Sequence, residues 1–70
     1  MFVAFQVHSS QGNFLRQYPE GTDIQAKMAE FVQEVQSEEW YQIKQHDCYH
    51  DEGKQCQPWV VLAEKGTIPE

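Results

Sequence analysis

The sequence has 70 residues, of which 40% are hydrophobic and 13% aromatic, and its 11 acidic and 5 basic side chains give a net charge of −6. This length predicts a single domain, residues 1–70, with a modest core, and the apolar content excludes an intrinsically disordered chain. The acidic balance and the dispersed basic residues argue against direct nucleic-acid binding, which requires a basic patch.

The first two predicted elements are short strands. Residues 2–8 alternate in polarity and place Val3, Phe5 and Val7 on one face, as expected of a half-buried strand. The small and polar residues 9–13 predict a turn. Residues 14–18 then predict a second strand, antiparallel to the first.

A helix is predicted next, over residues 22–37. Thr22 followed by Gln25 has the spacing of a capping box at its start, and we expect it to end near Glu38. Its apolar residues recur at helical spacing on one face. These residues are Ile24, Met28, Phe31, Val32 and Val35.

The last part of the chain predicts a hairpin. Residues 40–50 form the third expected strand and residues 57–65 the fourth, joined by a turn at 51–54. The predicted fold is therefore a small α+β domain in the order ββαββ, with one helix packed on one face of an antiparallel sheet.

The pairing of this hairpin is ambiguous from sequence. A two-residue loop pairs Ile43 with Leu62, whereas a three-residue loop pairs Ile43 with Val61. In both cases the fourth strand has apolar groups on both faces, and one helix covers only one of them. We therefore expect the uncovered face, with Trp40 or Trp59 according to register, to bind a partner, and a second copy is the simplest one.

Three glutamates form a row on the predicted helix, opposite its apolar face. Glu30, Glu34 and Glu38 are spaced i, i+4 and i+8. They fit an ordinary solvated helix face, or an acidic rim around a partner-binding surface. An alternative is mimicry of nucleic acid, in which the row would occupy the site of a nucleic-acid-binding protein.

Cysteine and histidine gather near the predicted hairpin tip. His46, Cys48 and His50 alternate on the third strand, and Cys56 returns on the fourth, so the four are candidate ligands of a zinc ion. However, alternate strand residues lie nearly 7 Å apart, and the Cys-x-x-Cys motif of common zinc sites is missing. A disulfide, a nucleophilic Cys48 and an unreactive pair of reduced thiols are the alternatives.

The sequence favours a non-enzymatic role, because no group that could stabilise an oxyanion accompanies Cys48. We expect a small cytosolic protein-interaction module that forms a homodimer and binds a protein partner, for which a basic protein is one candidate, through its uncovered sheet face and acidic rim. No cofactor is expected unless zinc binds at the hairpin. No segment reaches membrane-spanning length and no signal-peptide pattern is visible, so no membrane association is expected.

Overall fold

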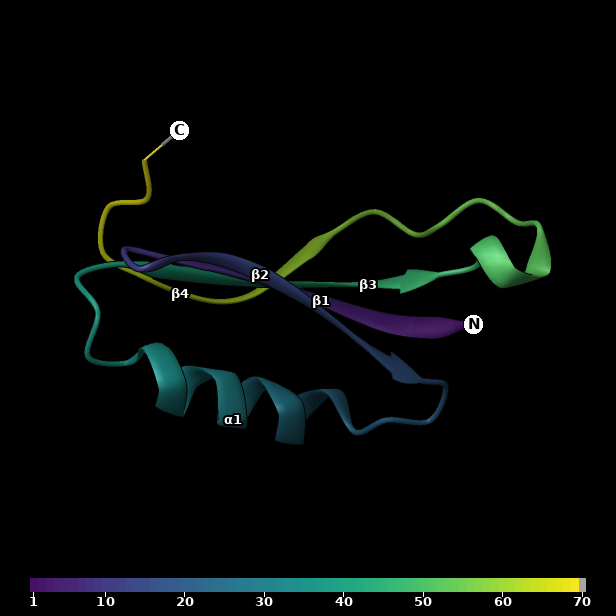
Figure 1. Cartoon of the computed structure of the whole chain (residues 1–70), viewed down its shortest axis with the longest axis horizontal. Coiled ribbons are helices and arrows are strands. Elements are labelled where there is room, and N and C mark those ends of the chain that lie inside the picture. Colours follow the sequence, from purple (N-terminus) through teal and green to yellow (C-terminus); the bar gives the residue numbers. More distant parts are fainter. Residues whose placement is uncertain (70) are drawn as a thin grey trace.

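The computed structural model describes residues 1–69, which form a four-stranded sheet and the helix α1. Figure 1 shows that α1 covers one face of the sheet. All strand pairs are antiparallel, and the strand order is β2-β1-β3-β4. The predicted α+β fold and its ββαββ order are confirmed. The elements are β1 (Phe2–Ser9), β2 (Gly12–Pro19), α1 (Ile24–Val35), β3 (Tyr41–Cys48), the 3₁₀ helix η1 (His50–Glu52) and β4 (Val60–Lys65).

The core lies between α1 and the central strand β1. The predicted inward face of β1 is confirmed, because Val3, Phe5 and Val7 are buried and pack with Phe31 of α1. The ring of Phe5 is fully buried, with its centroid 5.3 Å from that of Phe31. Strand β1 is paired on both sides, which accounts for its nearly continuous burial.

The N-cap residue of the helix lies one position after the predicted one. Asp23 is the N-cap residue, and its Oδ1 accepts a hydrogen bond from the backbone N–H of Ala26 at 3.1 Å. The predicted capping box at Thr22 is wrong, because the Thr22 hydroxyl donates instead to the carbonyl of Pro19 at 2.7 Å. This hydroxyl is therefore used in the turn that leaves β2.

The helix also ends earlier than predicted, at Val35 instead of near Glu38. A distant lysine satisfies carbonyl groups at and beyond this end: Lys65 Nζ, at the end of β4, donates to the carbonyl of Gln36 at 2.8 Å and to that of Glu38 at 3.0 Å. A cation at a helix C-terminus also interacts favourably with the helix dipole. Lys65 thus ties the last strand to the end of the helix.

Replacing Lys65 by methionine is expected to lower the free energy of unfolding by about 1 kcal/mol, since it removes two charge-assisted hydrogen bonds at a solvent-exposed position. Urea denaturation followed by circular dichroism measures this loss. Lys54→Met is the matched control, because the Lys54 ammonium makes only a 4.0 Å contact with Glu52 at the surface. Equal losses in the two variants would show that Lys65 does not act as a cap.

A β-bulge in β4 resolves the ambiguous register. The ladder pairs Gln45 with Val60 but Ile43 with Ala63, so that one extra residue, Leu62, is inserted in β4. The first pair belongs to the predicted two-residue loop, whereas the second fits neither predicted register. Because of the bulge, Leu62 and Ala63 are both half-buried against the core, although they are adjacent in the chain.

Candidate functional site

A groove lies beside strand β2, on the face of the sheet that carries the helix. Helix α1 packs mainly over β1, β3 and β4, and its side chains reach β2 at Phe14 and Tyr18. The groove has a volume of about 620 Å³. It is lined by Phe14, Arg16 and Tyr18 of β2 and by Glu30, Phe31, Gln33 and Glu34 of α1.

The floor of the groove is aromatic. Phe31 is buried, and its ring centroid lies 6.0 Å from that of the half-buried Phe14. The guanidinium of Arg16 lies over the Phe14 ring, 4.5 Å from its centroid, as in a cation–π contact. The groove therefore offers an apolar base with a cation on its strand side.

The helix wall of the groove is acidic. Glu30 forms an ion pair with Lys27 at 3.2 Å, whereas the Glu34 carboxylate has no ion-pair partner within residues 1–69. Glu38 lies beyond the end of α1, and its carboxylate accepts hydrogen bonds from Ser10 at 2.6 Å and Gln11 at 2.7 Å. Of the predicted row of three carboxylates, the structure therefore brings only Glu30 and Glu34 to the groove.

Strand β2 is an edge strand, and one side of its backbone is open. The carbonyl of Leu15 accepts a hydrogen bond from its neighbour Arg16 at 2.9 Å, which indicates that this carbonyl faces away from β1. Successive residues of an antiparallel strand direct their backbone groups to alternate edges. Asn13, Leu15 and Gln17 therefore present N–H and C=O groups at the open edge, directly beside the groove.

Both tryptophans that the sequence placed at a partner surface contact histidine rings. The indole of Trp59 stacks on the ring of His46, with centroids 3.8 Å apart and planes 20° from parallel, and Trp59 is 40% exposed. Trp40 packs edge-on against His8 at 4.8 Å. His8 and His46 point to the face opposite the helix, since they alternate with helix-facing neighbours on β1 and β3. The part that the tryptophans play in partner binding stays a prediction.

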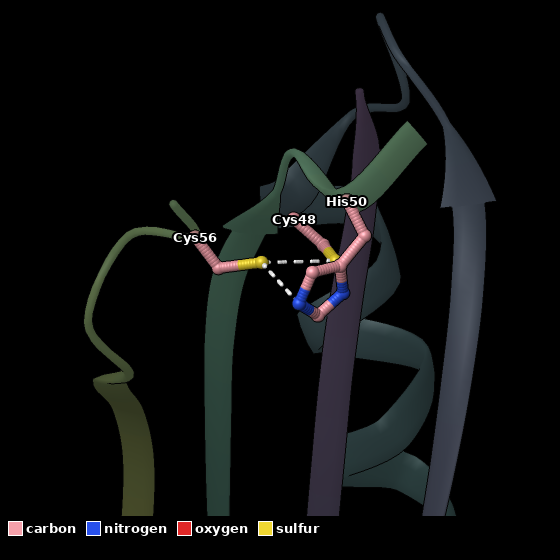
Figure 2. A group of neighbouring side chains, drawn as sticks. All are labelled: Cys48, His50 and Cys56. Atoms are coloured by element: carbon pink, nitrogen blue, oxygen red, sulfur yellow. Dashed lines mark hydrogen bonds between the residues drawn. The ribbon is translucent and has the colours of Figure 1, made fainter. Parts of the chain in front are cut away.

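Three of the four candidate metal ligands come together, and Figure 2 shows their side chains converging. Cys48 ends β3, His50 begins η1, and Cys56 follows in the segment that leads to β4. Cys56 Sγ lies 3.1 Å from Cys48 Sγ and 3.6 Å from His50 Nε2, and Cys48 Sγ lies 3.1 Å from His50 Nδ1. The fourth candidate, His46, lies outside this group: its Nδ1 contacts the carbonyl of Gln57 at 3.0 Å and its ring is stacked on Trp59.

The chain reversal after β3 brings these ligands together. The predicted hairpin turn at 51–54 is replaced by η1, which ends at Gly53 with a left-handed φ of +69°. Backbone hydrogen bonds then hold the returning segment, from Lys54 N–H to the Tyr49 carbonyl and from Gln57 N–H to the Asp47 carbonyl. Cys56 thus approaches Cys48 through a short helical turn instead of through cross-strand pairing.

The thiols of this group are free, and Cys48 is buried. A hydrogen bond with the backbone of His50 lowers the pKa of Cys48, but the hydrogen bond with the Cys56 thiol and desolvation by burial together outweigh it, so the pKa is raised above its usual range. Nearby, the amino terminus of Met1 contacts Asp51 at 2.9 Å and Glu52 at 3.0 Å. These hydrogen bonds raise the pKa of the Met1 amino group to about 10.

Comparison with known proteins found no protein family, no curated protein and no solved structure that matches the chain. Within residues 1–69, no helix is long and apolar enough to cross a membrane.

The groove was not predicted from the sequence. Phe14, Arg16 and Tyr18 alternate along the second predicted strand, and large side chains at every second residue are a signal that one face of the strand makes contacts. Where α1 crosses the sheet decides whether that face is covered or open, and no local pattern specifies this position.

Proposed function

We propose that this chain is a non-enzymatic protein-interaction module that binds an extended segment of a partner protein along β2. The observation that carries the proposal is the combination of an open strand edge with a groove directly beside it. The proposal includes the cytosol as its location, where the two free thiols of Cys48 and Cys56 would stay reduced.

The backbone of β2 supports this mode of binding. An extended peptide adds a strand to an exposed sheet edge by pairing with its open N–H and C=O groups, while every second side chain enters a neighbouring pocket. In this chain the open groups belong to Asn13, Leu15 and Gln17, and the pocket is the groove between β2 and α1. Main-chain pairing would supply affinity, and the groove would supply sequence preference.

The charges indicate which partner segment fits. Glu34 has no ion-pair partner within residues 1–69, and the whole chain carries a net charge of −6. Apolar side chains of the segment would contact Phe14 and Phe31, and a lysine or arginine would approach Glu34 and Glu30. We therefore propose a partner segment in which apolar and basic residues face the groove.

The other sheet edge is less suited to strand addition. Strand β4 has six residues and contains the bulge, whereas β2 has eight residues that all pair regularly with β1. Bulges twist an edge and discourage further pairing. Pro19, which has no N–H group, limits strand addition at the far end of β2.

Synthetic peptides with blocked backbone groups test this proposal. The probe is a short fluorescent peptide that alternates threonine with groove-facing valine and lysine, and fluorescence anisotropy measures its affinity. N-methylation of every second residue removes one set of N–H donors. Two peptides are compared, one methylated at the odd-numbered residues and one at the even-numbered residues. The peptide that loses the N–H groups facing β2 should bind at least about tenfold more weakly, at about 1 kcal/mol for each lost hydrogen bond, and the other should bind almost as the unmethylated peptide does.

The controls separate strand addition from other binding. Glu34→Gln should weaken binding and reduce its salt dependence, whereas Glu39→Gln, in the connector after the helix, should leave both unchanged. Equal effects of methylation in the two peptides would overturn the strand-addition proposal. The competing occupant of the β2 edge is a second copy of the chain. Light scattering of the free protein detects a dimer, and hydrogen exchange shows whether the β2 amides are protected in it. A stable dimer with protected β2 amides would show that a second copy, and not a partner segment, pairs with β2.

A further inference from the structure

We propose that Cys48, His50 and Cys56 bind a zinc ion, with the fourth coordination position open to water. This site lies at the end of β3 and around η1, and it is independent of the groove beside β2. Figure 2 shows the Cys56 sulfur atom facing both the Cys48 sulfur atom and the imidazole ring of His50. Three protein ligands with an exchangeable fourth one form a known type of zinc coordination.

The distances are close to those of a tetrahedral site. Two thiolates on one zinc ion lie about 3.8 Å apart, and a thiolate and an imidazole nitrogen about 3.6 Å apart, given Zn–S of about 2.3 Å and Zn–N of about 2.0–2.1 Å. Cys56 Sγ lies 3.6 Å from His50 Nε2 and 3.1 Å from Cys48 Sγ, whereas Cys48 Sγ contacts the other ring nitrogen, Nδ1, at 3.1 Å. With one ligand atom from each residue, the three atoms lie within 4.8 Å of one another, so shifts of about 1 Å in the sulfur atoms and the imidazole ring would admit one ion.

The ligand chemistry selects the metal. Two thiolates and an imidazole favour zinc over magnesium or calcium, which prefer oxygen ligands. The backbone N–H of Tyr49 lies 3.4 Å from Cys56 Sγ and donates to it. This hydrogen bond helps to hold the Cys56 sulfur beside Cys48 and His50.

The backbone around the site is already in place. Hydrogen bonds from Glu52 N–H and Lys54 N–H to the Tyr49 carbonyl hold the turn, and Gly53 N–H donates to the His50 carbonyl. These bonds restrain the backbone between Cys48 and Cys56, which lowers the conformational entropy that metal binding would cost. His46 lies outside the site, because its ring is stacked on Trp59 and its Nδ1 contacts the carbonyl of Gln57.

Spectroscopic titration with cobalt tests the proposal, because Co²⁺ accepts tetrahedral zinc sites and absorbs visible light. The full chain is reduced, its two thiols are counted, and Co²⁺ is added without oxygen. We expect a thiolate-to-cobalt charge-transfer band and intense visible bands that saturate at one ion per chain and disappear when zinc is added. Native mass spectrometry of the zinc-loaded chain should show the same stoichiometry.

The variants identify the ligands. His50 is exposed and Cys56 is half-buried, so His50→Ala and Cys56→Ser chains should both fold, and each should weaken Co²⁺ binding by at least about 100-fold. His46→Gln is the matched control and should bind Co²⁺ as tightly as the parent. Zinc should raise the melting temperature of the parent and of His46→Gln but not of His50→Ala.

Three results would overturn this zinc site. The first is a fully reduced chain that takes up neither cobalt nor zinc, in which case the close thiols are a redox pair and not a ligand set. The second is a His50→Ala chain that binds cobalt like the parent. The third is a loss of binding in His46→Gln as large as that in His50→Ala, since it would require ligands that the structure keeps apart.

Discussion

Replacing Phe5 by alanine is expected to leave the domain largely unfolded at room temperature. Its side chain is fully buried in the centre of β1 and contacts the rings of Tyr18 and Phe31. Truncating a buried phenylalanine costs about 3–5 kcal/mol, and a core of this size rarely supplies more than about 3–5 kcal/mol. Far-UV circular dichroism and urea denaturation with a metal chelator present measure the loss.

Phe2→Ala is the control for this variant. Phe2 lies on the same strand and has the same side chain, but it points to the opposite face and is 39% exposed. Its truncation should cost less than about 2 kcal/mol and leave the unfolding transition cooperative. If both variants lost the same stability, the assignment of the two faces of β1 would be wrong.

The second large effect is expected from Gly66→Ala, just after β4. Gly66 has a left-handed φ of +72°, and a Cβ atom at this position would lie 2.5 Å from the carbonyl oxygen of Glu39 and 3.1 Å from Cβ of Trp40. Both neighbours belong to the connector between α1 and β3, and one of them is a backbone atom that cannot rotate away. We expect a loss of at least about 2 kcal/mol, or roughly 10 °C in melting temperature.

Gly21→Ala separates the two causes of this loss. Gly21 also has a positive φ, +91°, but its Cβ would meet no atom within 4 Å. It should therefore show only the cost of the backbone conformation, about 1 kcal/mol. The difference between the two melting temperatures then measures the close approach of Gly66 to the connector, and equal shifts would show that the connector yields freely.

Much of the fold could be predicted from the sequence because its signals are local. Alternation at Val3, Phe5 and Val7 identified both the first strand and its inward face, and the spacing of Phe31 and Val35 identified the buried face of the helix. The bulge in β4 could not be predicted, since consecutive apolar residues on that strand fit either register almost equally. Packing of Leu62 against the helix-side core, a tertiary effect, selects the observed pairing.

The candidate sites also differ in how far local sequence signals predict them. Cys48, His50 and Cys56 were identified because sequence spacing placed them near one turn, and the structure brings their ligand atoms within 4.8 Å of one another. His46 was grouped with them because a regular strand was assumed to continue to residue 50, but β3 ends at Cys48 and η1 turns His50 toward the thiols. The groove depends on where the helix crosses the sheet, which no spacing encodes.

The central position of β1 has a consequence for how the chain folds. Its hairpin with β2 closes a short loop, and such hairpins form within about 1–10 μs. Its second partner is β3, and this ladder joins Ser9 to Tyr41 across the whole helix. The second hydrogen-bonding edge of β1 therefore stays unpaired in a nascent chain until residue 48 has been synthesised, and the closing of this long loop should set the rate at which the native state forms.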